Sequence, residues 1–263
     1  MFNFCSLYSG SSGNSLFVQT DNTKILVDAG ESAKKIETAL NSIDVNINDI
    51  DAVIVTHEHS DHIKGLSTIS KKFDIPIYAN KETWDAMPQV AEKTKNQNLF
   101  NVNEKFEIGD LKIVPFSIPH DAANPCGFNI FYNNQKISIA TDIGHIDKKI
   151  IKNLEESSFI LLESNYDSNI LSYSKYPYSL KQRIAGPNGH LSNEAAGKTV
   201  SYLLNSGLKN VMLGHLSKEN NFPELAYKTV IDELCASNFD ENKIKIAVAS
   251  RSNPSEILNL EVS

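Results

Sequence analysis

Short apolar runs separated by polar turns are the main pattern of this chain. Most contain Val, Ile, Leu or Phe, which is typical of strands in a folded sheet. The predicted strands lie at residues 16–18, 25–27, 53–55, 77–78, 113–116, 128–131, 137–140, 159–162, 211–213 and 244–248.

Capping residues predict helices between these runs. Ser32 is placed to cap a helix over residues 33–42, and Ser192 to cap one that runs to Leu204. Pro223 suits the first turn of a further helix, where its missing N–H needs no partner. Hairpin signals occur together with strand–helix alternation. This mixture favours an α+β fold with two mixed β-sheets in a sandwich and helices on the outer faces.

The composition is that of an ordinary globular protein, with 41% hydrophobic and 22% charged residues. No linker or low-complexity tract divides the chain, so we expect one domain over residues 1–263. No stretch approaches the ~20 apolar residues of a membrane helix, and the N-terminus lacks the features of a signal peptide. We therefore expect a cytoplasmic protein with no membrane partner; the sequence leaves its oligomeric state open.

Charge and cysteine content argue against two features, a broad basic surface and a disulfide framework. The net charge of −7 argues against a broad basic surface for nucleic acid, although bound divalent ions add positive charge that this count omits. Cys5, Cys126 and Cys235 are odd in number and far apart, so no disulfide framework is expected. Each is expected to be a small buried apolar residue.

Residues 56–62 read Thr-His-Glu-His-Ser-Asp-His and follow an apolar run. His57, His59, Asp61 and His62 thus gather three imidazoles and a carboxylate within six positions. Such side chains are usually exposed or polar-partnered, so packing does not explain the block. Imidazole nitrogen and carboxylate oxygen are ligands of Zn, Mn and Fe. The block therefore predicts a metal site.

Apolar runs elsewhere in the chain also end in a metal-competent residue. Strands that lie side by side gather the residues at their carboxyl ends along one edge, and a strand end holds a ligand rigidly. One such ending carries no information, but five indicate a shared site. The five residues are Asp28, His57, His120, Asp142 and His215.

This set resembles the metallo-β-lactamase superfamily in its dinuclear form, over essentially the whole chain. The segments at residues 9–15, 119–122, 162–165, 189–194 and 214–217 further resemble the YycJ/WalJ branch of that superfamily. Members of the branch are regarded as DNA exonucleases or metallohydrolases linked to DNA repair. The resemblance implies an αββα sandwich with the site at one sheet edge, which agrees with the strand-end pattern.

The resemblance also implies a role for each position. His57, His59 and His120 would hold one metal ion, and Asp61, His62 and His215 a second. Asp142 would bridge the two ions. Asp28 would lie behind the ligands and fix an imidazole tautomer by a hydrogen bond.

Three more residues have open roles. His190 either binds substrate phosphate or protonates a leaving oxygen, or is a surface histidine beside a helix cap. Glu163 ends an apolar run and is a candidate hydrogen-bond acceptor for a ligand. His145 is expected to be structural or solvent-facing.

The expected cofactor is a pair of divalent ions, Zn, Mn or Fe. Two ions ~3.5–4 Å apart share one water, lower its pKa and make a bridging hydroxide the nucleophile. Asp61 would orient that water or take its proton, which makes Asp61, Asp142 and His190 the candidate catalytic residues.

A phosphodiester is the preferred substrate class, and the resemblance points to DNA digested in the 5′-to-3′ direction. Basic residues near His190 and His215 are candidates for holding flanking phosphates, namely Lys175, Lys181, Arg183, Lys198 and Lys218.

Two other functions stay open. One is a small-molecule hydrolase that acts on a cyclic phosphodiester, thioester or lactam, because fold does not settle substrate. The other is an RNA-processing nuclease, which the 2′-OH would distinguish.

Overall fold

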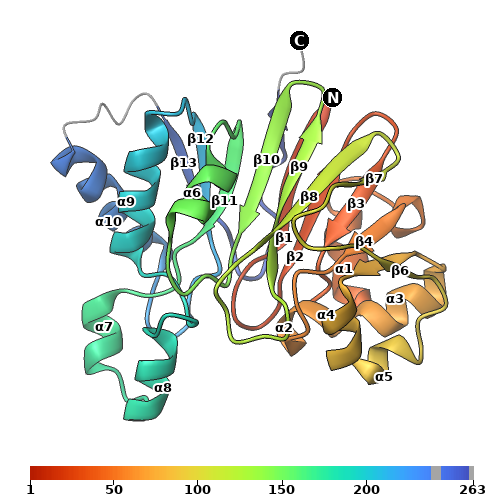
Figure 1. The fold of residues 1–263 in the computed structure, drawn as a ribbon, viewed down its shortest axis with the longest axis horizontal. Coiled ribbons are helices and arrows are strands. Elements are labelled where there is room, and N and C mark those ends of the chain that lie inside the picture. The colour runs from red at the N-terminus through yellow and green to blue at the C-terminus, as the bar shows by residue number, and fades with distance from the viewer. Residues whose placement is uncertain (238–243, 261–263) are drawn as a thin grey trace. The chain divides into compact units, whose positions relative to one another are not determined.

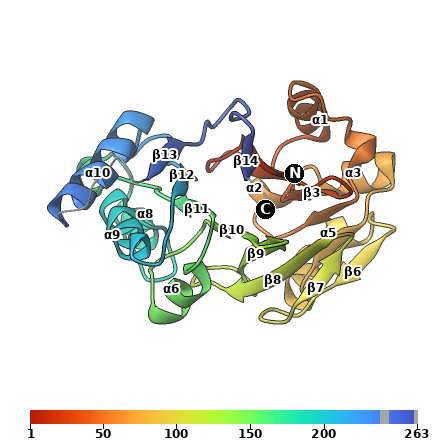
Figure 2. The same ribbon diagram turned by 90° about the horizontal axis from the view of Figure 1, so that it is seen from above.

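A computed structural model describes residues 1–237 and 244–260 of the chain. The chain forms two compact units that interleave in the sequence. The first contains residues 1–117, 122–135 and 250–263, and the second contains residues 118–121 and 136–249. The expected single domain stays a prediction. The described strands form two mixed sheets of seven strands each, as predicted (Figures 1 and 2).

The first unit contains one complete sheet, three further strands and most of the short helices. Its elements are β1 Phe2–Tyr8, β2 Ser15–Gln19, β3 Lys24–Val27, α1 Ala33–Asn41, η1 Ile47–Asp49, β4 Ala52–Ile54, α2 Ser60–Ile63, α3 Leu66–Phe73, β5 Ile77–Ala79, α4 Lys81–Ala86, α5 Pro88–Ala91, β6 Gln97–Leu99, β7 Phe106–Ile108, β8 Leu111–Ser117, β9 Cys126–Tyr132 and β14 Leu258–Leu260.

The sheet order in this unit is β14-β1-β2-β3-β4-β5-β6. Strands β14 to β3 pair antiparallel, and β3 to β6 pair parallel. The parallel half brings the carboxyl ends of β3 and β4 to one edge. Strands β7, β8 and β9 pair antiparallel with one another.

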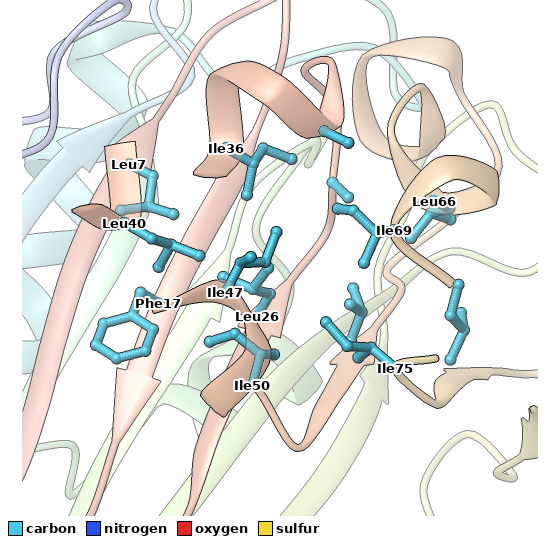
Figure 3. Packing of buried hydrophobic residues seen from close by; sticks show 14 of the residues in the cluster. Leu7, Phe17, Leu26, Ile36, Leu40, Ile47, Ile50, Leu66, Ile69 and Ile75 are labelled. Atoms are coloured by element: carbon cyan, nitrogen blue, oxygen red, sulfur yellow. The ribbon is translucent and has the colours of Figure 1, made fainter. Parts of the chain in front are cut away.

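The core of the first unit lies between the sheet and helices α1 and α3 (Figure 3). Helix α1 buries Ala33, Ile36 and Leu40, which the helical period places on one face. Leu7 and Phe17 from the sheet belong to the same buried cluster. Fully burying a side chain of this size stabilises a fold by about 1.5–3 kcal/mol. This packing holds the sheet edge that carries the candidate ligands.

The second unit contains a parallel run of strands with helices packed beside it. Its elements are β10 Gln135–Ala140, α6 Lys148–Leu154, β11 Phe159–Glu163, α7 Ser168–Tyr173, α8 Tyr178–Ile184, α9 Asn193–Leu204, β12 Asn210–Gly214, α10 Pro223–Ala236 and β13 Lys245–Val248. Strands β10 to β13 are parallel neighbours in chain order. Helices α9 and α10 pack side by side, and α6 also contacts α9 (Figures 1 and 2).

The predicted helices are confirmed. Ser32 caps α1 and Ser192 caps α9, each by accepting a backbone N–H with its side chain. Helix α10 begins at Pro223. None of the helices in the described part of the chain combines the length and apolar character needed to cross a membrane.

Two expectations need correction. Strand β1 was not predicted because polar residues interrupt its apolar pattern, yet it pairs with β2 and β14 and all seven of its residues are buried. Cys5 and Cys126 are buried as expected, but Cys235 is exposed. Helix α10 buries Ala226, Val230 and Leu234 on one face, and Cys235 lies about 100° away from Leu234 around the helix.

Candidate metal centre

Two parallel strands of the first unit deliver Asp28 and His57 to one sheet edge. β3 and β4 pair with Val27 opposite Ile54. The Asp28 N–H donates to the Ile54 carbonyl at 2.9 Å, which continues this ladder past the strand end. Both side chains are buried. The predicted convergence of these two strand ends is confirmed.

The histidine block follows β4 as a turn that leads into α2. The centroid of the His57 ring lies 4.6 Å from that of His59 and 4.1 Å from that of His62. Asp61 Oδ2 lies 3.8 Å from His62 Nε2. Three imidazoles and one carboxylate of the first unit thus lie in direct contact.

Asp28 fixes the orientation of His62. Its Oδ2 lies 2.7 Å from His62 Nδ1 and accepts the Thr56 hydroxyl at 2.8 Å, while its Oδ1 accepts the Thr56 N–H at 2.9 Å. A carboxylate only accepts, so Nδ1 of His62 carries the hydrogen and Nε2 keeps its lone pair. Asn14 Nδ2 lies 3.1 Å from that Nε2. His62 is therefore held in the tautomer that binds metal through Nε2.

A close backbone contact positions the turn that contains Asp61. The Asn14 N–H donates to the Asp61 carbonyl at 2.8 Å, and the Gly30 N–H donates to the Asn14 carbonyl at 2.7 Å. A Cβ at Gly30 would overlap the Asp61 carbonyl oxygen. Only glycine permits this approach. The segment that follows Asp28 is thus shaped to hold the turn that carries Asp61.

Three parallel strands of the second unit deliver Asp142, Glu163 and His215 to a common edge. In their register Ala140 lies opposite Leu162, and Glu163 opposite Gly214. Asp142 follows β10, Glu163 ends β11 and His215 follows β12. All three side chains are buried. The strand-end pattern is confirmed here as well.

Glu163 organises this edge by using both of its oxygens. Its Oε1 lies 2.8 Å from Nδ1 of His190 and 2.8 Å from Nδ1 of His215. Its Oε2 accepts the N–H of Ile143 at 2.8 Å and that of Leu191 at 3.0 Å. It therefore fixes both rings with Nδ1–H toward itself, and holds the backbone beside Asp142 and His190.

His120 and His190 complete the group in the second unit. His120 Nδ1 lies 3.1 Å from the Gly189 carbonyl oxygen. Asp142 Oδ1 lies 3.8 Å from His120 Nε2, 3.7 Å from His190 Nδ1 and 3.5 Å from His215 Nδ1. Asp142 thus lies among three imidazoles, and with Glu163 the cluster takes its members from five separate segments.

Burial and neighbouring charges have opposite effects on the pKa values of these buried groups. Burial lowers the pKa of His120 and outweighs the opposing pull of Asp142, which favours the neutral ring that metal ions bind. Burial also opposes a charge on His190, but Glu163 outweighs it and the pKa of His190 is raised. For Glu163 the effect of burial is overcome by His190 and His215, so the Glu163 pKa is lowered.

Three of the strand-end residues have a left-handed backbone. Their φ angles are 62° at Asp28, 58° at Asp142 and 54° at His215. Residues other than glycine rarely adopt this region, and each such residue costs about 1–3 kcal/mol. Repeated strain at strand ends that carry two candidate ligands and the supporting Asp28 is typical of a functional site.

The donor set fits a divalent metal. Asp142, Glu163, His190 and His215 each place a ligand atom within 4.8 Å of those of the others. In the first unit Asp28 prepares the Nε2 lone pair of His62. Buried carboxylates are costly unless cations pair with them, and these residue types match Zn, Mn or Fe.

The sequence missed two supporting residues. Thr56 connects Asp28 to His57, since its hydroxyl lies 3.0 Å from His57 Nδ1. Asn165 Nδ2 donates to the His215 carbonyl at 2.7 Å. Both are adjacent to motif residues in the sequence, but their geometry became visible only in the fold. His145, expected to be structural or solvent-facing, is exposed, with Nδ1 2.8 Å from the Pro187 carbonyl.

The change Asp28→Asn is expected to weaken metal binding about 10- to 100-fold with little loss of folding. Asn tolerates the left-handed backbone, but an uncharged amide holds the His62 tautomer less firmly. Titration against a chelating dye measures the affinity. Asp44→Asn is a matched control, because Asp44 is exposed and has a φ of 58°. Equal affinities in the two variants would contradict the assigned role of Asp28.

Comparison with known proteins agrees with this fold. The β-lactamase superfamily domain matches residues 23–215. Exodeoxyribonuclease YycJ of Bacillus anthracis is 39% identical over 238 residues, which are 90% of each chain. Exodeoxyribonuclease WalJ of Streptococcus pneumoniae is 37% identical over 241 residues, again 90% of each.

A solved structure extends the agreement to the whole fold. The metallo-β-lactamase fold protein YhfI from Bacillus subtilis matches with a TM-score of 0.73 and 16% identity, and the match covers 97% of this chain and 100% of YhfI. The predicted fold class is confirmed. The chain therefore belongs to the metallo-β-lactamase superfamily and is a hydrolase of that superfamily.

Proposed function

We propose that this hydrolase is a divalent-metal-dependent DNA exonuclease that digests from 5′ to 3′. The carrying observation is the identity to two exodeoxyribonucleases over nine tenths of the chain. The buried carboxylate–imidazole clusters of the two units supply metal-binding chemistry in support. A link to DNA repair and a cytoplasmic location remain predictions from the sequence.

Two divalent ions, Zn, Mn or Fe, are proposed to bind the predicted donors. His57, His59 and His120 would hold one ion, and Asp61, His62 and His215 would hold the other. Asp142 would contribute its carboxylate to both. Asp28 and Glu163 support this assignment, because each fixes the Nδ1–H tautomer of a proposed ligand, His62 and His215.

Ions at such a site supply a nucleophile by lowering the pKa of water, and they neutralise phosphate charge. The protein orients the reacting groups. Asp61 is proposed to position the attacking water. His190 is proposed to contact the substrate phosphate or the leaving oxygen, because its ring is partly exposed beside the buried Asp142. Glu163 keeps the His190 ring in place.

Digestion of end-labelled linear DNA tests the proposal. With Mn, Zn or Fe added singly, we expect a 5′ label to be released early as short products and a 3′ label to be released last. Covalently closed circular DNA should resist, because it has no end. Release of the 3′ label first would overturn the direction, and cleavage of the circle would overturn the exonuclease assignment.

Two further substrates test the rival functions under the same conditions. An RNA strand of the same sequence differs at the 2′-OH, so faster digestion of the RNA would favour an RNA-processing nuclease. Hydrolysis of a cyclic phosphodiester, a thioester or a lactam without any attack on DNA would favour a small-molecule hydrolase.

A further inference from the structure

A groove in the second unit lies between α6 and α9 and is not used by the proposed metal ligands. Its volume is about 410 Å³, and Ile151 of α6 and Ala195, Lys198 and Tyr202 of α9 line it. The two helices lie close together in both views (Figures 1 and 2). A space of this size is within the range of small-ligand sites.

The groove adjoins the carboxylate–imidazole cluster of the second unit, which contains His120, Asp142, Glu163, His190 and His215. His190 and Gly144 are part of its lining. Gly144 lies two residues after Asp142, and His190 Nδ1 lies 3.7 Å from Asp142 Oδ1. A molecule in the groove would therefore meet the face of the cluster that carries His190.

The charge of the groove is opposite to that of the chain. The chain has a net charge of −7, yet the groove lining includes Lys198 and no carboxylate. On α6, Lys148 precedes Ile151 by three residues and shares its face through the helical period. Lys148 and Lys198 are exposed and have no ion pair among the described residues. This local excess of positive charge favours an anionic occupant.

An aromatic surface lies beside these charges. Tyr202 is 56% exposed and is four residues after Lys198, so the two side chains are neighbours on α9. Ser192, Ala195 and Thr199 share that face and are small, which leaves the Tyr202 ring accessible. Exposed tyrosine beside lysine is the combination that binds single-stranded nucleic acid, with bases on the ring and phosphates on the amines.

We propose that this groove holds the single-stranded DNA next to the scissile phosphate. One base stacks on Tyr202, and flanking phosphates contact Lys198 and Lys148. The inference rests on the proposed function and adds to it a strand-binding track along α9. It implies that the base on Tyr202 is unpaired or ends the duplex, since a base inside a duplex has no free face for the ring.

A second tyrosine-rich hollow in this unit is less suitable. Tyr173 and Tyr176 line it together with Lys175 and Glu219, and the Glu219 carboxylate offsets the positive charge of Lys175, which disfavours phosphate. Two nearby cations are already engaged: Arg183 Nε donates to Asp121 at 2.6 Å, and Lys181 Nζ donates to the Ser172 carbonyl at 2.6 Å. None of the residues that line this hollow belongs to the carboxylate–imidazole cluster.

Binding without catalysis tests the groove. A fluorescently labelled single-stranded oligonucleotide is titrated with the chain in excess chelator, and anisotropy is read at several salt concentrations. Tyr202→Ala should weaken binding roughly 5- to 150-fold, whereas Tyr202→Phe should bind like the native chain. Lys198→Ala should reduce the slope of log affinity against log salt by about 0.7.

Matched controls lie outside the groove. Tyr227 of α10 is also exposed, and Lys209 precedes β12 with an exposed side chain. Tyr227→Ala and Lys209→Ala should leave affinity and salt slope unchanged. If the groove and control variants behave alike, the inference is overturned.

Photo-crosslinking locates the base and separates this inference from the proposed function. An oligonucleotide with 5-iodouracil near its end should crosslink to Tyr202, and a crosslink at Tyr173 instead would overturn the groove. If the chain hydrolyses DNA and the groove variants bind the oligonucleotide like the native chain, the inference fails and the proposed function stands. Crosslinking at Tyr202 without any hydrolysis would remove the nuclease function and leave the binding track.

Discussion

The change Asp142→Asn is expected to lower turnover of DNA by about 10³-fold or more, while the chain stays folded. Asp142 is the carboxylate proposed to contact both ions, and it lies within 3.8 Å of the nearest nitrogen of His120, His190 and His215. Removing its charge weakens the site that neutralises the phosphate. Metal ions supply several kcal/mol of such stabilisation, which corresponds to this loss in rate.

Asparagine is the informative replacement because of the backbone at this position. The φ of 58° at Asp142 is tolerated by asparagine, whereas alanine would add strain. The neighbouring Ile143 N–H is held by Glu163 and not by the Asp142 side chain. The loop should therefore keep its shape in Asp142→Asn, so that a loss of activity is not a loss of fold.

The measurement is the initial rate of nucleotide release, with thermal unfolding as the test of folding. Asp74→Asn is the matched control, because Asp74 is exposed and has a φ of 56°. That variant should retain native turnover. Native turnover in Asp142→Asn would remove the proposed metal contact, whatever the control does.

The sheet edges were predictable because strand order in the sequence matches neighbour order in space. β10, β11 and β12 are consecutive and parallel, so an apolar run followed by Asp142 or His215 was enough to place both residues at the same edge. The same holds for Asp28 and His57 after β3 and β4. A local rule about strand ends then suffices.

The features that the sequence did not predict depend on contacts between distant segments. Glu163 accepts from His190, His215 and two backbone amides that lie 20 and 28 residues away. No spacing pattern specifies such a convergence. The groove between α6 and α9 was missed for the same reason, because its lysines lie on two helices separated by β11, α7 and α8.

The sequence pattern also did not predict the short helices. Helices α7 and α8 have six and seven residues, and α8 has no buried residue. An amphipathic repeat needs a buried stripe over several turns, which neither helix has. Local hydrogen bonds, such as those from Asn169 and Ile170 to the Asp167 cap of α7, fix them instead.

Removal of divalent metal is expected to abolish hydrolysis and lower the melting temperature by roughly 5–10 °C. A ligand that is present at a hundred times its dissociation constant stabilises the folded state by about 2.7 kcal/mol, and each kcal/mol shifts the melting temperature of a chain of this size by about 2–4 °C. Asp142, Glu163, His120 and His215 are buried together, so the metal-free site keeps donor groups in contact without a cation.

The experiment compares the chain after dialysis against a chelator with the same sample after addition of Mn, Zn or Fe. Thermal unfolding and DNA hydrolysis are both followed. The active metal should restore both signals, and Asp74→Asn should respond like the native chain. Asp142→Asn should show a smaller thermal shift, because the missing carboxylate weakens metal binding in the folded state and not in the unfolded chain. If the chelator changed neither the melting temperature nor hydrolysis, the buried carboxylates and imidazoles would have a purely structural role.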